Sequence, residues 1–93
     1  MIKSFRNAAA QAAWERQFMK GIPNDIMKSA NRKLTQIHNA RSLHDLSAPP
    51  GNRLERLAGE RKGQHSIRIN DQWRICFRWC DGDAFEVEIV DYH

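Results

Sequence analysis

The last third of the sequence alternates apolar and polar residues with a period of two, which is the pattern of a strand with one buried and one exposed face. The alternation covers residues 65–69, 73–79 and 85–90, and an Asp-Gly-Asp turn at residues 81–83 separates the last two stretches. Neighbouring strands must turn their apolar sides toward one core, because a one-residue slip in pairing inverts a strand. The pattern therefore predicts an antiparallel sheet with an apolar face and a polar face.

The first half of the sequence carries helical patterns. Residues 7–20 are rich in alanine and place Trp14 and Phe18 four positions apart, which predicts a helix that ends at Gly21. Pro-Asn-Asp at residues 23–25 suits the start of a second helix. The remaining signals are the apolar stripe of that helix (Ile26, Ala30, Leu34, Ile37), a helical turn at 41–46, a break at 48–51, and short extended segments at 2–5 and 53–57.

Helices in the first half and strands in the second predict an α+β fold, with N-terminal helices packed on one face of an antiparallel sheet. The 93 residues fit one domain, 1–93, with a modest core. No apolar run approaches the roughly 20 residues that cross a bilayer, and the N-terminus lacks the apolar stretch of a secretion signal. We therefore expect a cytoplasmic protein that does not contact a membrane.

The cysteines and histidines give no sign of a disulfide or a metal site. Cys76 and Cys80 would lie roughly 13 Å apart in a strand, which is too far for a disulfide. The histidines have no partners at ligand spacing, so we expect no metal and no cofactor. Trp73 and Trp79 share the parity of the apolar side, and we interpret them as core residues.

Positive charge is concentrated before the last strand. Between positions 53 and 78 the sequence has seven Lys or Arg residues and three acids, whereas from position 79 on it has five acids and no Lys or Arg. The net charge of +4 favours an anionic partner such as nucleic acid. Matching the apolar faces places Arg68 opposite Arg74 or nearby, and on the next hairpin it places Ile75 near Val87 and Arg74 near Glu88. One polar face would then carry Ser66, Arg68, Arg74, Arg78 and Tyr92.

Two interpretations of these polar residues stay open from spacing alone. Guanidinium groups on one face are suited to holding phosphate, or Arg74 and Arg78 form ordinary ion pairs with Glu88 and Glu86. Tyr92 is suited to stacking on a base or transferring a proton, or it is an amphipathic residue at a strand end. His93 is suited to act as an acid or a base, or it is a frayed chain end. Asp91 is suited to orient a neighbouring group, or it caps the strand.

The stretches 52–59, 63–77 and 87–93 resemble the HigB branch of the RelE-type toxins, which are the toxin halves of bacterial toxin–antitoxin modules. The motifs on which this resemblance rests are Ser-Ile-Arg-Ile-Asn-Asp-Gln-Trp-Arg-Ile-Cys-Phe at 66–77 and the closing Asp-Tyr-His at 91–93. The opening residues 1–5 fit as well, and the likeness to GraT-like members is the greatest within the branch. The resemblance covers nearly the whole chain and implies a compact domain with helices on a strongly twisted antiparallel sheet.

The resemblance also implies an endoribonuclease that cuts mRNA on the ribosome without a metal, using the 2′-hydroxyl of the RNA to attack the adjacent phosphate. By this resemblance Arg74 holds the phosphate, Tyr92 stacks or transfers a proton, and His93 with Asp91 does acid–base work. The residues expected to contact RNA or the ribosome are Arg53, Arg61, Lys62 and Arg68. The implied partner is a helix-turn-helix antitoxin of the HigA kind, and operator DNA would be bound only through the complex with it.

The chain departs from the resemblance at two positions. Well-known HigB toxins carry a histidine and a lysine where Glu55 and Ala58 stand here. Because one donor that stabilises transition-state charge is often worth about 3 kcal/mol, an attenuated nuclease is expected. The alternative function is a non-catalytic growth inhibitor that binds the ribosome or RNA and interferes with ribosome assembly or translation.

Overall fold

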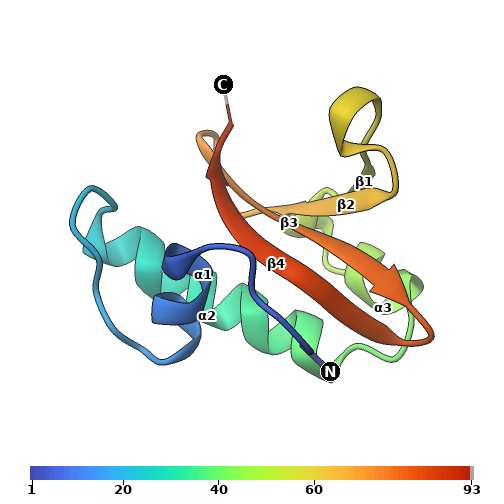
Figure 1. Cartoon of the computed structure of the whole chain (residues 1–93), viewed down its shortest axis with the longest axis horizontal. Coiled ribbons are helices and arrows are strands. Elements are labelled where there is room, and N and C mark those ends of the chain that lie inside the picture. The colour runs from blue at the N-terminus through green and yellow to red at the C-terminus, as the bar shows by residue number, and fades with distance from the viewer. Residues whose placement is uncertain (93) are drawn as a thin grey trace.

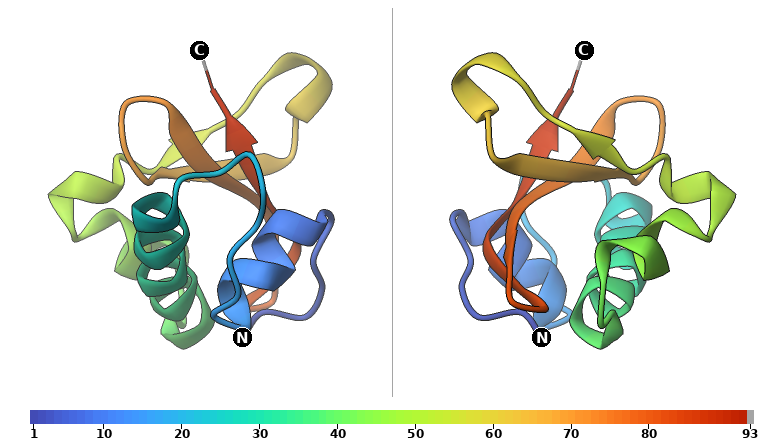
Figure 2. Two further views of the ribbon diagram at one scale, coloured as in Figure 1. Left: turned by 90° about the vertical axis from the view of Figure 1, so that its left-hand side faces the viewer. Right: turned by 90° about the vertical axis from the view of Figure 1, so that its right-hand side faces the viewer.

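The computed structural model describes residues 1–92 and has three α-helices on one side of a four-stranded antiparallel sheet (Figures 1 and 2). The strand order in the sheet follows the order in the chain, β1-β2-β3-β4. This arrangement confirms the predicted α+β fold. The elements are α1 (Ala8–Trp14), α2 (Asn24–Asn39), α3 (Leu43–Ser47), the short 3-10 helices η1 (Pro50–Asn52) and η2 (Gly59–Arg61), and the strands β1 (Glu55–Arg56), β2 (Gln64–Arg68), β3 (Trp73–Cys80) and β4 (Asp83–Asp91).

The β2–β3 pairing has the predicted register, with Arg68 opposite Arg74, but the β3–β4 register lies two residues from the approximate one that the pattern predicted. Ile75 pairs with Ile89 two residues beyond Val87, and Arg74 pairs with Val90 two residues beyond Glu88. The hairpin turn accounts for one residue of this shift, and a β-bulge between Cys76 and Arg78, where two residues of β4 oppose one residue of β3, accounts for the other.

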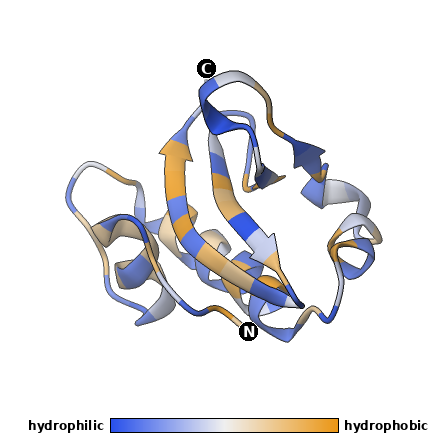
Figure 3. Ribbon diagram, turned by 45° about the vertical axis from the view of Figure 1, so that its right-hand side comes forward, coloured by the Kyte–Doolittle hydropathy of each residue, from blue (hydrophilic) through white to orange (hydrophobic). Residues whose placement is uncertain are grey.

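The bulge keeps the two faces of the sheet separate. Asp81 and Gly82 both have positive φ, as a two-residue hairpin turn requires, and this turn pairs Cys80 with Asp83. Without the bulge, the register set by this turn would place Ile75 opposite Glu88, and each face of the sheet would carry both apolar and polar side chains. The extra residue of the bulge, Glu86, has φ of 52° and restores the alternation that Figure 3 shows along the long strands.

The bulge also corrects the assignment of Phe85 to the apolar side. Before the bulge, Phe85 pairs with Arg78, and buried Ala84 takes the place on the core side opposite Trp79. After the bulge, Val87 and Ile89 face the core. The sequence pattern alone counted Phe85 with the later residues because it contains no direct sign of the bulge.

The first helix is shorter than predicted, because it ends at Trp14. Arg16 adopts a left-handed conformation with φ of 60°. Its N–H donates to Ala13 O at 3.2 Å and the N–H of Gln17 donates to Ala12 O at 2.8 Å, which is the hydrogen-bond pattern of a Schellman ending. Phe18 therefore does not lie one turn above Trp14 on a helix but in an irregular connection to α2.

Asn7 joins the N-terminal segment to both layers. Its Oδ1 accepts from the N–H of Ala10 and so caps α1, while its Nδ2 donates to Ile89 O at 2.9 Å. The predicted extended segment at 2–5 runs parallel to β4 through bridges from Ile2 to Ala84 and from Phe5 to Val87. The edge of β4 is thereby covered along its length.

The core lies between the sheet and the two longer helices. Its largest fully buried side chains include Leu34 and Ile37 of α2 and Ile75 and Phe77 of β3. Burying side chains of this size stabilises the fold by about 1.5–3 kcal/mol each. Trp73 and Trp79 pack against this core, as predicted. Among residues 1–92, no helix is both long enough and apolar enough to span a membrane.

Candidate active site

Arg74 lies at the centre of the polar side of the sheet and is only 7% exposed. Its Nε donates to Ser66 Oγ at 2.8 Å, and its Nη2 donates to Arg53 O at 2.7 Å and to Ser66 O at 3.4 Å. Arg53 offers this carbonyl from a left-handed conformation with φ of 43°. These contacts fix the guanidinium plane before any ligand arrives, which is the condition for effective charge stabilisation.

One nitrogen of Arg74 stays open to solvent. Within residues 1–92, Nη1 makes no hydrogen bond, whereas Nε and Nη2 are both engaged. No fully buried side-chain nitrogen or oxygen of the described residues lacks a hydrogen-bond partner, so Nη1 must reach solvent. A fixed guanidinium with one free edge is suited to binding a phosphate oxygen.

One aromatic side chain and one carboxylate lie near the Arg74 guanidinium. The ring centroid of Tyr92 lies 5.9 Å from Arg74 Cζ, as the predicted parity requires, and the Tyr92 side chain is exposed. Glu55 of β1 places Oε1 4.0 Å from Arg74 Nη2 and is half-exposed. The alternative in which Arg74 pairs with Glu88 is not observed, because the carboxylate near Arg74 is that of Glu55.

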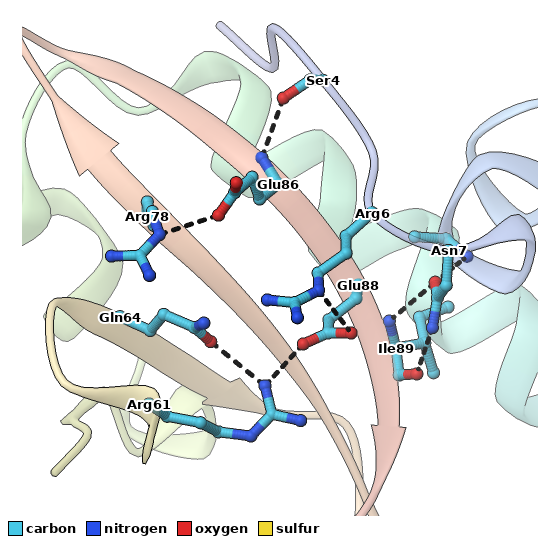
Figure 4. Close-up of polar contacts among 10 residues, drawn as sticks. Ser4, Arg6, Asn7, Arg61, Gln64, Arg78, Glu86, Glu88 and Ile89 are labelled. Atoms are coloured by element: carbon cyan, nitrogen blue, oxygen red, sulfur yellow. Dashed lines mark hydrogen bonds and ion pairs between the residues drawn. The ribbon is translucent and has the colours of Figure 1, made fainter. Parts of the chain in front are cut away.

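Glu88 instead pairs with Arg61 and Arg6 (Figure 4). Arg61 Nη1 donates to Glu88 Oε1 at 2.5 Å and to Gln64 Oε1 at 3.1 Å, while Arg6 Nε lies 4.0 Å from Glu88 Oε2. The hydrogen bond with Glu88 raises the pKa of Arg61. Glu88 is thus a nearly buried carboxylate that occupies the position between two guanidinium groups where a phosphate would also be attracted.

Arg78 forms the ion pair that the sequence left open as its alternative role. Its Nε lies 2.7 Å from Glu86 Oε2, and both side chains are about half exposed (Figure 4). Glu86 is the bulge residue, and its N–H donates to Ser4 Oγ at 2.9 Å. The irregular backbone of β4 therefore directs this carboxylate toward the polar side.

We call this surface the arginine face. It comprises the four guanidinium groups, their carboxylate partners and three neighbouring polar side chains: Arg6, Arg61, Arg74, Arg78, Glu55, Glu86, Glu88, Gln64, Ser66 and Tyr92.

The structure separates some of the other predicted site residues from this cluster. Arg68 lies opposite Arg74 in the register, but its guanidinium pairs with Asp71 in the β2–β3 connection. Arg53 and Lys62 are exposed beside the cluster, at the end of η1 and of η2. Asp91 pairs with Trp73 in the register and so points to the opposite side of β4 from Tyr92, where it accepts from Gln72 Nε2. The predicted catalytic His93 lies outside the described residues.

Sequence reasoning missed three members of the arginine face. Arg6 comes from the N-terminal segment, Gln64 was left without a role, and Glu55 was noted only as the loss of a basic group. The antiparallel pairing of Glu55 with Ser66 brings its carboxylate beside Arg74, and this pairing had no sequence signal beyond a short extended segment.

Cys76 lies under the arginine face, opposite Glu88 in the register, and is fully buried. Burial raises the pKa of its thiol. Among residues 1–92, no group of three or more His, Cys, Asp or Glu side chains is placed to hold a metal ion.

Comparison with known proteins identifies the family. Residues 3–93 match the family described as the RelE-like toxin of the type II toxin-antitoxin system HigB. Toxin HigB-1 of Vibrio cholerae is 48% identical over 63 residues, which is 68% of this chain and 66% of that toxin. Endoribonuclease HigB of Proteus vulgaris is 32% identical over 93 residues and matches over the full length of both chains.

A solved structure supports the fold independently of close sequence similarity. A chain of the YoeB-YefM complex from Staphylococcus aureus superposes with a TM-score of 0.59 at 18% identity, covering 100% of this chain and 98% of that one. Identity this low bears on the arrangement of helices and strands alone.

Proposed function

Since the chain belongs to the HigB-like family of RelE-type toxins from type II toxin–antitoxin systems, we propose that it is an endoribonuclease that cuts mRNA on the ribosome. The observation that carries the proposal is the fixed Arg74 guanidinium, with the Tyr92 ring centroid 5.9 Å from its Cζ and Glu55 Oε1 4.0 Å from its Nη2. The proposed location of the protein is the cytoplasm, because its substrate is mRNA on the ribosome. The proposed reaction uses no metal ion or cofactor.

The proposed reaction is an internal transfer at phosphorus. The 2′-hydroxyl oxygen of the RNA forms a bond to the adjacent phosphorus while the bond to the 5′-oxygen breaks, which leaves a 2′,3′-cyclic phosphate and a 5′-hydroxyl. Arg74 stabilises the additional charge on the phosphate oxygens. The Glu55 carboxylate accepts the 2′-hydroxyl proton, and Tyr92 or His93 protonates the leaving oxygen.

The remaining predicted residues take supporting roles. Tyr92 also offers its exposed ring for stacking on a base. Arg53, Arg61, Lys62 and Arg68 contribute positive charge for RNA and ribosome binding. Asp91 acts as a positioning residue, because it points away from Tyr92 and holds the end of β4 through Gln72. Neutralisation of Arg61 by Glu88 supports the expectation of an attenuated enzyme.

The family brings an antitoxin partner. We propose that it is a helix-turn-helix protein of the HigA kind and that operator DNA is bound only through the toxin–antitoxin complex.

Cleavage of ribosome-bound mRNA by the purified protein tests the proposed function. Wild-type protein and the exposed-surface control Arg41→Ala should cut, whereas Tyr92→Ala and Glu55→Gln should lose about a hundredfold in rate. Inhibited translation without any cut by the wild type would support the alternative, a non-catalytic ribosome-binding inhibitor. Full cleavage by both site variants would reject the assigned residues.

A further inference from the structure

A second cationic surface lies on the helical layer, away from the arginine face. A hollow of about 310 Å³ opens between the α1–α2 connection and the first turns of α2. Arg16 and Phe18 line it from the connection, and Met27, Lys28 and Arg32 line it from the helix. We call it the Phe18 groove. The helices lie on the opposite side of the sheet from the segment that carries Arg61 (Figure 2).

Phe18 is the most exposed large apolar side chain among residues 1–92, at 57%. The others of this class are Met1 and Tyr92, and Tyr92 belongs to the proposed active site. Lys28 Nζ lies 6.0 Å from the centroid of the Phe18 ring, a distance that leaves the ring open to another contact. The exposed Phe18 ring provides apolar area that a partner can cover, beside a hollow whose wall includes the nearly buried Met27.

The cations of the groove have no internal anion to neutralise them. Within residues 1–92, Arg16, Lys28 and Arg32 form no ion pair, and the guanidinium of Arg32 donates to Ser29 Oγ at 2.9 Å. Each guanidinium group of the arginine face, in contrast, lies within 4.0 Å of a carboxylate. The groove therefore presents uncompensated positive charge around an apolar wall.

The backbone holds Arg16 in this wall at a cost. Its φ of 60° is a conformation that glycine adopts without strain and that costs other residues about 1 kcal/mol. A glycine would complete the same helix ending. The fold needs the left-handed conformation at this helix end but not an arginine side chain to adopt it, so the strain is a reason to look for a role of Arg16 in binding.

We infer that the Phe18 groove is the docking site for the antitoxin, and that it receives an acidic segment carrying an apolar side chain. The apolar side chain fills the hollow against Phe18 and Met27, and flanking carboxylates pair with Arg16, Lys28 and Arg32. A protein fits this surface better than RNA does, because the cations surround one hollow and do not form a track along which a phosphate backbone could run. The inference rests on the family's antitoxin partner and does not depend on the cleavage reaction.

The test measures the dissociation constant of the full-length toxin for the purified product of the adjacent antitoxin reading frame. Phe18→Asp should weaken binding by roughly 30-fold or more and Lys28→Glu by about tenfold, as expected for residues central to an interface. Arg41→Glu is the matched control, because it reverses an exposed charge outside the groove and should leave the constant unchanged. Phe18→Ala, with circular dichroism and thermal melts, separates loss of binding from loss of folding.

Three outcomes would overturn the docking site. The first is that Phe18→Asp and Lys28→Glu both bind the antitoxin with the same dissociation constant as the wild type. The second is that the antitoxin does not bind the wild-type toxin at all. The third is unchanged antitoxin binding by Phe18→Asp together with weakened ribosome binding or an altered oligomeric state, which would assign the groove to RNA or to a second copy. Absence of mRNA cleavage by the wild type would reject the proposed function but leave the binding comparison intact.

Discussion

The arginine face and the Phe18 groove are both cationic, but they differ in whether carboxylates of the chain itself pair with their positive charges. On the arginine face Glu55, Glu86 and Glu88 lie within 4.0 Å of guanidinium groups, whereas the groove cations have no carboxylate partner within residues 1–92. A neutralised cluster is rigid and ordered before it binds, and an un-neutralised one is ready for an external anion. The comparison suggests that precise positioning is needed on the first surface and charge attraction on the second.

The paired surface must give up internal contacts when it binds. A phosphate that approaches Arg61 competes with a carboxylate already hydrogen-bonded at 2.5 Å. Arg74 avoids this competition in part, because its contacts to Ser66 and to the Arg53 carbonyl leave one nitrogen free. We expect Arg74 to contribute most to phosphate binding and the Glu88 pair to limit it.

The largest expected effect is that of Arg74→Ala. The change leaves Ser66 and the Arg53 carbonyl without their donor and should lower the free energy of unfolding by about 3 kcal/mol. It should also reduce mRNA cleavage at least about a hundredfold. Denaturant unfolding and the ribosome cleavage assay measure the two effects. Arg74→Lys should recover part of the stability but little cleavage, since lysine lacks the planar fork.

Lys28→Ala is the corresponding change in the groove. The free energy of unfolding should stay within about 0.5 kcal/mol of wild type, because no ion pair is lost. A loss equal to that of Arg74→Ala would remove the contrast between the two surfaces.

Glu88→Gln should produce the next largest effect. It frees Arg61 and Arg6 from their carboxylate partner, so affinity for a short RNA should rise about tenfold at fixed salt. Filter binding at constant ionic strength measures it, because phosphate contacts depend strongly on salt. Glu60→Gln is the matched control, an exposed acid of the nearby η2. Equal affinity of both variants would show that Glu88 does not restrain the site.

Arg16→Gly should change stability in the opposite direction from Arg74→Ala. Relief of the left-handed conformation should raise stability by about 1 kcal/mol, and the melting temperature by about 5 °C, while antitoxin binding weakens. Arg53→Gly is a control at the other cationic surface, since it relieves a similar conformation and should leave antitoxin affinity unchanged. A lower melting temperature for Arg16→Gly would mean that the Arg16 side chain stabilises the fold.

The smallest expected effect is on pH dependence. Burial, and after it the charge of Arg56, lowers the pKa of His65, whose ring lies against Phe77 on the core side. The unfolded chain then binds a proton more readily, so the stabilisation is complete above about pH 6.5 and is lost as pH falls through the lowered pKa. Unfolding free energies measured from pH 7.5 to 5.5 should decline slightly, and less so in His65→Gln.

Much of the fold follows from local patterns, and the exceptions have identifiable physical causes. Period-two alternation predicted the sheet and the common side of Ser66, Arg74 and Tyr92. The register of β4 depended on a bulge at Glu86. The sequence gives no sign of this bulge, because glutamate and not glycine adopts the positive φ there. The early end of α1 at Arg16 was missed for the same reason.

The candidate site was predictable only in part, because its members come from five separate segments. Arg74 and Tyr92 lie on the long strands, where parity decides their side of the sheet. Arg6 and Glu55 reach the site through a bridge to β4 and a two-residue strand, and neither contact leaves a periodic signal. The partners of each arginine depend on such long-range contacts, so they emerged only with the structure.

Cleavage of ribosome-bound mRNA by Tyr92→Ala and Phe18→Asp, measured side by side with wild type, tests the division of labour between the two surfaces most directly. Tyr92→Ala should cut about a hundredfold more slowly than wild type, and Phe18→Asp should cut at the wild-type rate. A wild-type cleavage rate for Tyr92→Ala, or loss of cleavage in a folded Phe18→Asp variant, would mean that cleavage does not belong to the arginine face alone.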